Sequence, residues 1–381
     1  WRAWRGQLPT GIDLACIAYA ERYGDRSRAV VQRGGITFTL SSLESRALFS
    51  LLIKRPTSFR RDVVKLLARS AFRRAITPAP LISGNLYFNI GHTGLDRMGH
   101  RRWIAKSGVR PVYYVHDLIP ITHPQYTRQG ETERHIARMT TVLHCGAALI
   151  ANSHDSIERL AAFASEHGIA MPPTLPAPLG MEPFIAKPAT NSPLATSYFV
   201  VLGTIEGRKN HALLLDVWRK LAERMGNATP KLVIIGQRGW AADDVIATLD
   251  SDALLGTHVI ELGRCGDKEL VNWLAHARAL LFPSIVEGQG LPLVEALALG
   301  TPVIASDLGV FRETAKDIPE YIDPFDRTGW LGAIEDYTIS PENRRARQIE
   351  RMHDFAPPNW DDHFAAVNAW LEKLGLMSWR A

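Results

Sequence analysis

With 381 residues, the chain is too long for one ordinary core and about right for two domains of roughly 190 residues each. An apolar fraction of 46% with 22% charged residues is typical of a globular protein, and the sequence has no apolar run of about 18 residues, which excludes a predicted membrane-spanning helix. The net charge of +5 is unevenly spread, since residues 1–190 carry 25 Lys+Arg against 13 Asp+Glu, whereas residues 191–381 carry 19 against 26.

Short apolar runs predict four strands in the first half of the chain. They cover 29–32, 86–90, 111–115 and 148–151, and the last two are typical of buried parallel strands. Apolar residues recur at helical spacing over 12–23, 41–53, 60–76 and 154–167. The first half is therefore predicted to contain both strands and helices.

The second half alternates strands and helices more regularly. Strands are predicted at 198–202, 231–235, 259–262, 279–282 and 302–305, with helices at 212–224, 268–277 and 292–298. This alternation predicts an α/β fold with a doubly wound parallel sheet in each half. A proline-containing stretch of weak periodicity, 181–197, is the predicted linker. The predicted domains are 1–180 and 198–355, and 356–381 is predicted to be a C-terminal helix that can cross back to the first domain.

The strongest chemical signal is the segment FPSIVEGQGLPLVEALALG, residues 282–300. A predicted strand ends at Phe282, a glycine-bearing loop follows, and Pro292 falls in the first turn of a predicted helix. Backbone N–H groups at such a helix start can bind phosphate. Glu287 on the loop and Glu295 on the helix can accept hydrogen bonds from sugar and ribose hydroxyls. The segment therefore predicts a sugar-nucleotide site, and the alternative is an ordinary strand–loop–helix with two surface acids.

This segment resembles the E-x7-E signature of family-4 retaining glycosyltransferases. The resemblance spreads over most of the chain, through residues 115–120, 152–153, 201–211, 234–240, 262–270 and 301–306. Within the family, the sequence is most similar to the bacterial surface-polysaccharide branch that includes O-antigen mannosyltransferases. The resemblance implies a GT-B fold, with two Rossmann-like domains facing each other across a cleft. It also implies metal-independent, retaining transfer of a hexose, with mannose from GDP-mannose as the first candidate.

The resemblance also implies roles for single residues. The implied catalytic residues are His116 near the anomeric carbon, Lys209 on the leaving diphosphate and Glu287 facing the donor sugar. Glu295 is expected to hold the ribose hydroxyls. The remaining implied donor-binding residues are Gly11, Gly203, Thr204, Arg208, Gly288, Gln289, Gly290 and Leu291. Many family members carry arginine where this chain has Thr204, and Arg208 is the candidate to compensate.

Other candidates carry weaker signals. His92, in a glycine-bearing loop, and Asp117 are predicted to bind the acceptor, although a satisfied loop histidine and a turn-capping aspartate are the alternatives. Asp250-Ser-Asp252 has the D-x-D form of metal-dependent glycosyltransferases but follows a predicted helix, the wrong end of an α/β unit for a ligand. No cluster of His, Cys and carboxylates has metal-ligand spacing, so we predict neither metal nor cofactor.

The expected partners are a nucleotide-sugar donor, a polyprenyl-diphosphate-linked oligosaccharide acceptor and an anionic membrane surface, without nucleic acid. The widely spaced Cys16, Cys145 and Cys265 fit a reducing compartment, so we expect a cytoplasmic protein peripheral on the inner leaflet. Membrane binding is predicted from a basic amphipathic stretch, residues 46–74, for which the alternative is a core helix with a solvated basic face. Its basic residues are Arg46, Lys54, Arg55, Arg60, Arg61, Lys65, Arg69, Arg73 and Arg74. A nucleotide-sugar epimerase, a phosphorylase and a non-catalytic scaffold subunit remain alternative functions on the same fold.

Overall fold

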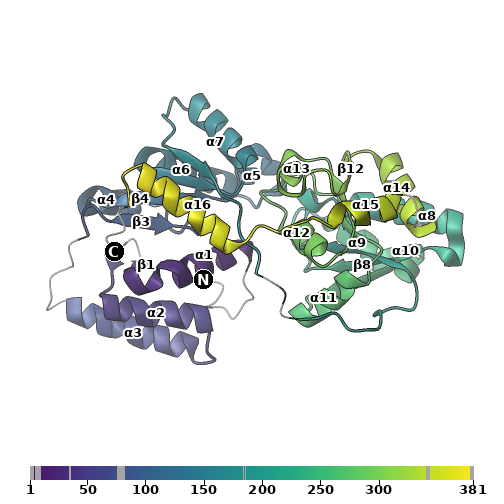
Figure 1. Ribbon diagram of the computed structural model, residues 1–381, viewed down its shortest axis with the longest axis horizontal. Helices are drawn as coiled ribbons and strands as arrows, with labels where there is room; N and C mark the ends of the chain where they lie inside the picture. The colour runs from purple at the N-terminus through teal and green to yellow at the C-terminus, as the bar shows by residue number, and fades with distance from the viewer. Residues whose placement is uncertain are drawn as a thin grey trace.

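The computed structural model describes residue 4 and residues 10–33, 36–74, 82–182, 184, 186–339 and 344–377. Two α/β units lie next to each other along the long axis of the molecule, and each has its own parallel sheet (Figure 1). The α/β class predicted from the sequence is therefore confirmed. No helix in the described part of the chain is both long and apolar enough to span a bilayer.

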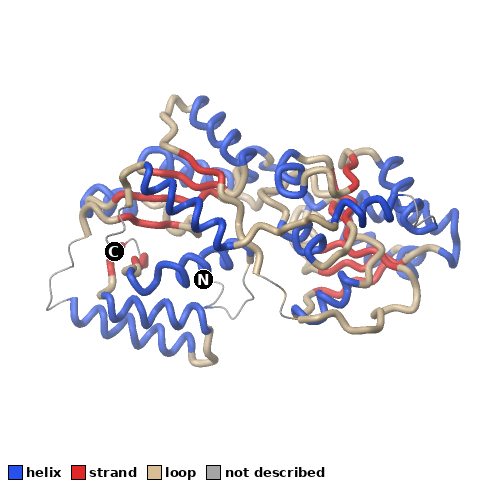
Figure 2. Tube along the Cα trace, viewed as in Figure 1, coloured by secondary structure: helices blue, strands red, loops and turns tan. Residues whose placement is uncertain are grey.

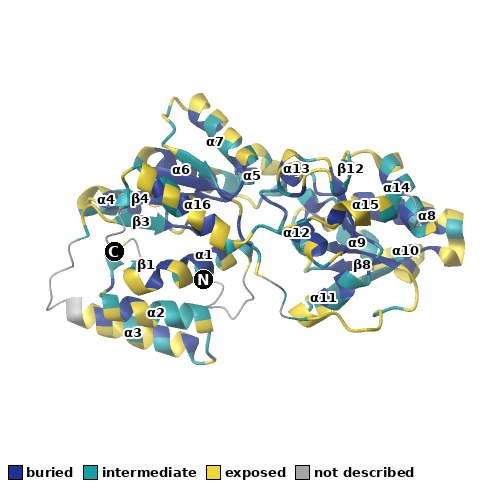
Figure 3. Cartoon of the chain, in the orientation of Figure 1, coloured by how far each residue is buried: buried dark blue, intermediate teal, exposed yellow. Residues whose placement is uncertain are grey.

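The N-terminal unit is built on four parallel strands in the order β3-β4-β5-β6. Their bounds are Leu86–Asn89, Arg110–Val115, Ala148–Ala151 and Thr174–Pro176. One core cluster joins the sheet to α1 (Gly11–Tyr23), and the other joins it to α6 (Glu131–Cys145) and α7 (His154–Glu166). The strands are buried between these layers (Figure 3). The remaining helices of this unit are α4 (Met98–Ser107), α5 (Ile119–Thr122), η2 (Gly24–Arg26) and η3 (Pro124–Tyr126).

A hairpin and two helices form a separate layer of the N-terminal unit. The strand predicted at 29–32 is β1 (Val30–Arg33), which pairs antiparallel with β2 (Ile36–Thr39) outside the parallel sheet (Figure 2). Only two residues separate these strands, and a parallel crossover needs about a dozen. After the hairpin come α2 (Ser42–Lys54), which starts with a capping box between Ser41 and Glu44, and α3 (Phe59–Arg74).

The C-terminal unit has six parallel strands in the order β12-β11-β10-β7-β8-β9. In chain order, the strands are β7 Tyr198–Leu202, β8 Lys231–Ile235, β9 Val259–Gly263, β10 Leu280–Phe282, β11 Val303–Ser306 and β12 Glu320–Ile322. The strand order reverses between β7 and β10, and ligands of such sheets bind beyond the carboxyl ends of the strands at this switch point. The helices around the sheet are η4 Gly207–Lys209, α8 His211–Met225, η5 Gly226–Ala228, α9 Asp243–Ser251, α10 Ala253–His258, α11 Asp267–Ala275, α12 Leu291–Ala298, α13 Gly309–Ala315, α14 Arg327–Ile339 and α15 Arg344–Met352.

The last helix, α16 (Trp360–Lys373), returns from the C-terminal unit to the N-terminal one (Figure 1). Phe364, Val367 and Leu371 are buried in the same core cluster as Tyr19 of α1. The Tyr19 hydroxyl also lies 2.9 Å from Nε2 of His363. The two units are thus joined by a second chain crossing that is anchored in an apolar core.

Candidate functional site

The candidate site begins where β7 and β10 end, at the switch point of the larger sheet. The chain leaves β7 through Gly203 and reaches Lys209 in η4, and it leaves β10 through the loop that contains Glu287. Lys209 Nζ donates to Glu287 Oε1 at 2.5 Å, and both side chains are buried. Lys209 Nζ also lies 4.7 Å from the centroid of the Phe282 ring. The fold therefore brings together two residues 78 positions apart that the sequence had assigned to one site.

A second ion pair continues this cluster. Arg208 Nη1 lies 2.9 Å from Glu287 Oε2, and Arg208 Nη2 lies 2.7 Å from a carboxylate oxygen of Glu206. The Ser284 hydroxyl donates to Glu287 at 2.9 Å. Burial opposes ionisation of Glu287, but the adjacent Arg208 and Lys209 charges lower its pKa to about 2. Two cations and two carboxylates thus balance each other in the unliganded cluster, which we call the switch-point cluster (Glu206, Arg208, Lys209 and Glu287).

Glu295 lies in α12, about one turn from the helix start. Burial raises the pKa of its carboxyl to about 7, with a further rise from the negative charge of Asp267. Among the described residues, none forms a hydrogen bond or ion pair with the Glu295 side chain. The side chain is half-buried, and its carboxyl oxygens are left to accept hydrogen bonds from a ligand. Its environment therefore differs sharply from that of Glu287.

The loop between the two glutamates touches the N-terminal unit. A methyl group placed on Gly288 would lie 2.8 Å from the backbone oxygen of His116, so only glycine fits there. The Ser153 hydroxyl donates to the Gly288 carbonyl at 3.3 Å. The Gln289 side chain makes two hydrogen bonds to the Leu179 backbone, of 3.1 and 3.2 Å. These contacts place His116 beside the loop between Glu287 and Glu295. The Gln289 side chain joins the two units, so only the Gln289 backbone is left to bind a donor.

The other predicted donor-binding residues surround this loop. A methyl group on Gly11, the first residue of α1, would lie 3.0 Å from Leu291, the first residue of α12, so the two helix starts adjoin. Gly290 precedes α12 with a φ of 88°, a conformation that favours glycine. Gly203 lies against the Lys209 side chain. The Thr204 side chain instead lies against Gly239, in the loop after β8.

Three buried histidines line the N-terminal side of the site. His116 Nε2 lies 2.7 Å from the Ile90 carbonyl oxygen, and His92 Nε2 lies 2.7 Å from that of Tyr114. The His116 and His92 rings are 5.3 Å apart, and His135 lies 5.8 Å from His92. Burial lowers the pKa of all three imidazoles, which keeps them neutral near pH 7. Asp117 accepts a hydrogen bond from the Ile119 backbone at 3.0 Å, which is the turn-capping alternative.

Several site residues were missed by reasoning from the sequence. Glu206, Ser284 and His135 belong to no recognised spacing, and only their closeness in sequence to Arg208, Glu287 or Arg134 could have suggested them. The two carboxylates of the D-x-D segment interact with other parts of the same unit. Asp250 pairs with Arg238, and Asp252 pairs with Arg219 and caps α10. In the part of the chain that the structure describes, no group of three or more His, Cys, Asp or Glu residues could hold a metal ion.

The match to a known protein family lies mainly in the C-terminal unit. Residues 185–352 match the family model described as "Glycosyl transferases group 1". The chain is 29% identical over 262 residues to the serotype-specific mannosyltransferase WbdA of Escherichia coli, which covers 65% of this chain and 32% of that protein. It is 35% identical over 129 residues to the O-antigen chain mannosyltransferase B of Escherichia coli, covering 34% of this chain and 33% of that protein. The matched region thus spans about a third of the length of these relatives.

Solved structures share the whole architecture. Anabaena Alr3699/HepE in complex with UDP aligns over 96% of this chain and 97% of its own, with a TM-score of 0.66 and 16% identity. An Escherichia coli structure titled as trehalose-6-phosphate bound with UDP-2-fluoro glucose aligns over 97% of both chains, with a TM-score of 0.61 and 14% identity. At these identities the likeness concerns the fold alone. It confirms the predicted GT-B arrangement of two Rossmann-like units.

Proposed function

Because residues 185–352 match the model of the group 1 glycosyltransferases, we propose that the chain transfers a hexose from a nucleotide diphosphate sugar to an oligosaccharide acceptor in bacterial surface-polysaccharide assembly. The observation that carries this proposal is the switch-point cluster. The half-buried Arg208 and the buried Lys209 lie where α/β sheets bind phosphates, and Glu287 holds them there. The names of the relatives make mannose the first candidate for the sugar and GDP-mannose for the donor.

Donor binding exchanges one set of charges for another. The diphosphate brings negative charge to Lys209 and Arg208, and the start of α12 offers backbone N–H groups. Glu287 is then released from Lys209 and can accept hydrogen bonds from the donor sugar. Glu295, which has no protein partner among the described residues, accepts from the ribose hydroxyls. Because the protein supplies two cations, we expect transfer to persist in EDTA.

The reaction follows from where these charges lie. The acceptor oxygen bonds to the anomeric carbon as the bond from that carbon to the diphosphate oxygen breaks. The electron pair leaves with the diphosphate, which takes the acceptor proton, and Lys209 stabilises the developing charge. Attack from the leaving-group side retains the anomeric configuration. His116 donates through Nε2 to Ile90, so its Nδ1 is left to accept a hydrogen bond from a sugar hydroxyl.

A transfer assay tests the proposed reaction. Purified protein would be incubated with GDP, UDP, dTDP and ADP sugars and a mannose-terminated oligosaccharide, and the product anomer would be read by proton NMR. We expect one nucleotide sugar to give a new α-linked product from an α-linked donor. Interconversion of the nucleotide sugar without an acceptor would instead indicate an epimerase. Binding of the donor with neither hydrolysis nor transfer would indicate a scaffold.

We also propose that the acceptor is carried on polyprenyl diphosphate and that α3 docks on the anionic inner leaflet. Arg61, Lys65 and Arg69 recur on one exposed face of α3, with Val64 (51% exposed) and Phe72 (71% exposed) beside them. Val63 and Ser70 on the opposite face are buried. Basic residues near such a membrane contribute about 1 kcal/mol each. The side chains of Arg73 and Arg74, and the helix predicted beyond them at 75–76, lie outside the described residues.

Liposome co-sedimentation tests this docking. We expect binding that requires anionic lipid, falls with salt and weakens in the variant Arg61→Glu/Lys65→Glu/Arg69→Glu. A matched variant, Lys220→Glu, changes an exposed lysine on α8 of the other unit and should bind like the wild type. Equal recovery of the protein in the supernatant with and without anionic lipid would contradict the membrane proposal and leave the transferase proposal unaffected.

A further inference from the structure

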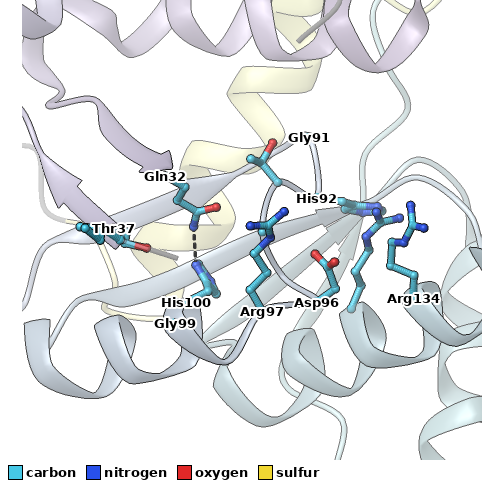
Figure 4. A pocket seen from close by; sticks show the side chains of 13 residues that line it. Gln32, Thr37, Gly91, His92, Asp96, Arg97, Gly99, His100 and Arg134 are labelled. Atoms are coloured by element: carbon cyan, nitrogen blue, oxygen red, sulfur yellow. Dashed lines mark hydrogen bonds between the residues drawn. The ribbon is translucent and has the colours of Figure 1, made fainter. Parts of the chain in front are cut away.

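The N-terminal unit contains a cavity of about 820 Å³ that no predicted donor residue lines. Its walls come from the β1–β2 hairpin, the loop after β3, and helices α4 and α6 (Figure 4). This volume is in the range of small-molecule sites. We call it the arginine cavity, after Arg97, Arg134 and Arg138, which line it. Figure 4 shows the Arg97 and Arg134 side chains extending toward the same space as His92, with Asp96 between them.

The arginine cavity carries an excess of positive charge, because three arginines line it beside two carboxylates, Asp96 in the lining and Glu131. Arg134 and Arg138 share a single carboxylate, Glu131, at 3.0 and 2.6 Å. Within the described ranges, Arg97 has no ion pair. The lining histidines add no charge near neutral pH, because burial lowers the pKa of His100 to about 4 and that of His92 as well. Guanidinium groups bind the oxygens of phosphate and carboxylate through paired N–H donors, so this wall suits an oxyanion.

Two buried polar atoms in this wall lack partners among the described residues. One is the donor Nε of Arg138, and the other is the acceptor Oε1 of Gln32. Gln32 is held in place by a 2.7 Å contact between its Nε2 and Nδ1 of His100. Buried polar atoms are nearly always satisfied, and those left over in a cavity indicate a ligand or water. One spare donor beside arginines and one spare acceptor suit a ligand that carries both an oxyanion and a hydroxyl.

The cavity is also linked to the proposed reaction centre by packed side chains. His92 lines the cavity, and its ring packs against His116 at 5.3 Å. The His116 backbone in turn contacts Gly288, in the loop between β10 and α12. The arginine cavity is therefore separated from His116 by the His92 ring, so the two lie in neighbouring parts of the N-terminal unit.

We propose that the arginine cavity binds an oxyanion of the acceptor, so that the acceptor substrate is an anionic sugar compound rather than a neutral glycan. This inference rests on the proposed transferase function, because it identifies the ligand as the acceptor. The oxyanion has two chemical sources, the diphosphate that links the glycan to a lipid and the carboxylate of an acidic sugar. Gln32 accepts a hydrogen bond from a neighbouring hydroxyl in either case.

Calorimetric binding of three probes tests this assignment. The probes are inorganic pyrophosphate, glucuronate and glucose, each measured with the wild type and with Arg97→Gln/Arg134→Gln. Arg97 and Arg134 are exposed side chains, so the substitutions should leave the fold intact. The control is Arg102→Gln, which changes another exposed arginine of α4 that does not line the cavity. Lys209→Ala removes the donor phosphate site, to which pyrophosphate can also bind.

We expect at least one anionic probe to bind, and its affinity to fall at least tenfold in the double variant but not in Arg102→Gln or Lys209→Ala. Preference for pyrophosphate identifies the lipid diphosphate as the source, and preference for glucuronate identifies an acidic sugar. Binding no tighter than that of glucose, or binding that the double variant leaves unchanged, overturns the inference. A nucleotide-sugar titration of the same wild-type sample separates the two proposals, since its failure counts against the transferase function and not against an anion site.

Discussion

The two units use positive charge in opposite ways. In the C-terminal unit, the charges of Arg208 and Lys209 are balanced by the carboxylates of Glu206 and Glu287 within the switch-point cluster. In the N-terminal unit, the arginine cavity leaves Arg97 unpaired and makes two other arginines share one carboxylate. A ligand of the first site must displace an internal carboxylate from both cations, whereas a ligand of the second finds one arginine, Arg97, without an ion pair among the described residues. Under the proposed function, the first site stays neutral until a diphosphate enters, and the second is prepared for an anion.

Lys209→Ala should give the largest effect in the C-terminal unit. We expect a fall in turnover of roughly a hundred- to a thousandfold, as for other groups that stabilise charge in a transition state. Folding should survive, because Glu287 keeps Arg208 and Ser284 as partners. Steady-state kinetics with and without EDTA measure the loss, and Lys220→Ala on α8 is the matched control. Turnover within a few-fold of wild type would show that the lysine does not carry the leaving charge.

Glu287→Gln should lower kcat more than it raises the donor KM. A lost hydrogen bond from a charged group costs about 1.5–3 kcal/mol, or roughly ten- to a hundredfold in rate. The variant should also unfold at a lower temperature, because Arg208 and Lys209 lose their shared carboxylate. Kinetics combined with thermal unfolding test both effects. A raised KM with unchanged kcat would mean that Glu287 acts only in ground-state binding.

Arg208→Lys should be milder than either change. Lysine keeps the charge but cannot bridge Glu206 and Glu287 as the guanidinium does, so we expect roughly tenfold weaker donor binding. Fluorescence titration of a nucleotide sugar measures this loss. Wild-type affinity in Arg208→Lys would show that donor binding needs the positive charge at this position and not the paired donors of the guanidinium.

Glu295 should produce the smallest effect, a dependence on pH. Its carboxyl titrates near pH 7 in the folded protein, and we expect only the ionised form to hold the ribose. Donor affinity should therefore rise by up to about tenfold between pH 6 and 8 in the wild type and stay flat in Glu295→Gln. Stability changes in the opposite direction. The folded protein keeps a proton that the unfolded chain releases near pH 4.5, so this contribution to stability is lost as the pH rises from 4.5 through 7. Parallel slopes in the two proteins would contradict the assignment.

The same two regions show what the sequence can predict. The proposed donor side lies in two continuous segments, 202–211 and 282–295, where strand, loop and helix follow one another, so a resemblance carried by local sequence could propose roles for Lys209, Glu287 and Glu295. The arginine cavity joins Gln32, His92, Arg97 and Arg134 from separate elements, and no local pattern connects them.

Helices α4 and α6 were missed for a related reason. His100 and His135 occupy buried positions in these helices where an apolar residue would have completed the periodic pattern. A histidine reads as polar in a sequence, although here each is buried and kept neutral. The strand at 29–32 was predicted but its hairpin partner was not, because a short apolar run does not show whether its partner strand is parallel or antiparallel.

Calorimetric titration of nucleoside diphosphates tests the central claim most directly. GDP, UDP, dTDP and ADP would each be titrated into the wild type, Lys209→Ala, Glu295→Gln and Arg97→Gln/Arg134→Gln at pH 8, where Glu295 is ionised. We predict that at least one nucleotide binds the wild type at a single site. Its affinity should fall at least tenfold in Lys209→Ala and Glu295→Gln and stay unchanged in the cavity variant. Absence of binding by all four nucleotides, or affinity unaffected by Lys209→Ala and by Glu295→Gln, would contradict a donor site at the junction of β7 and β10.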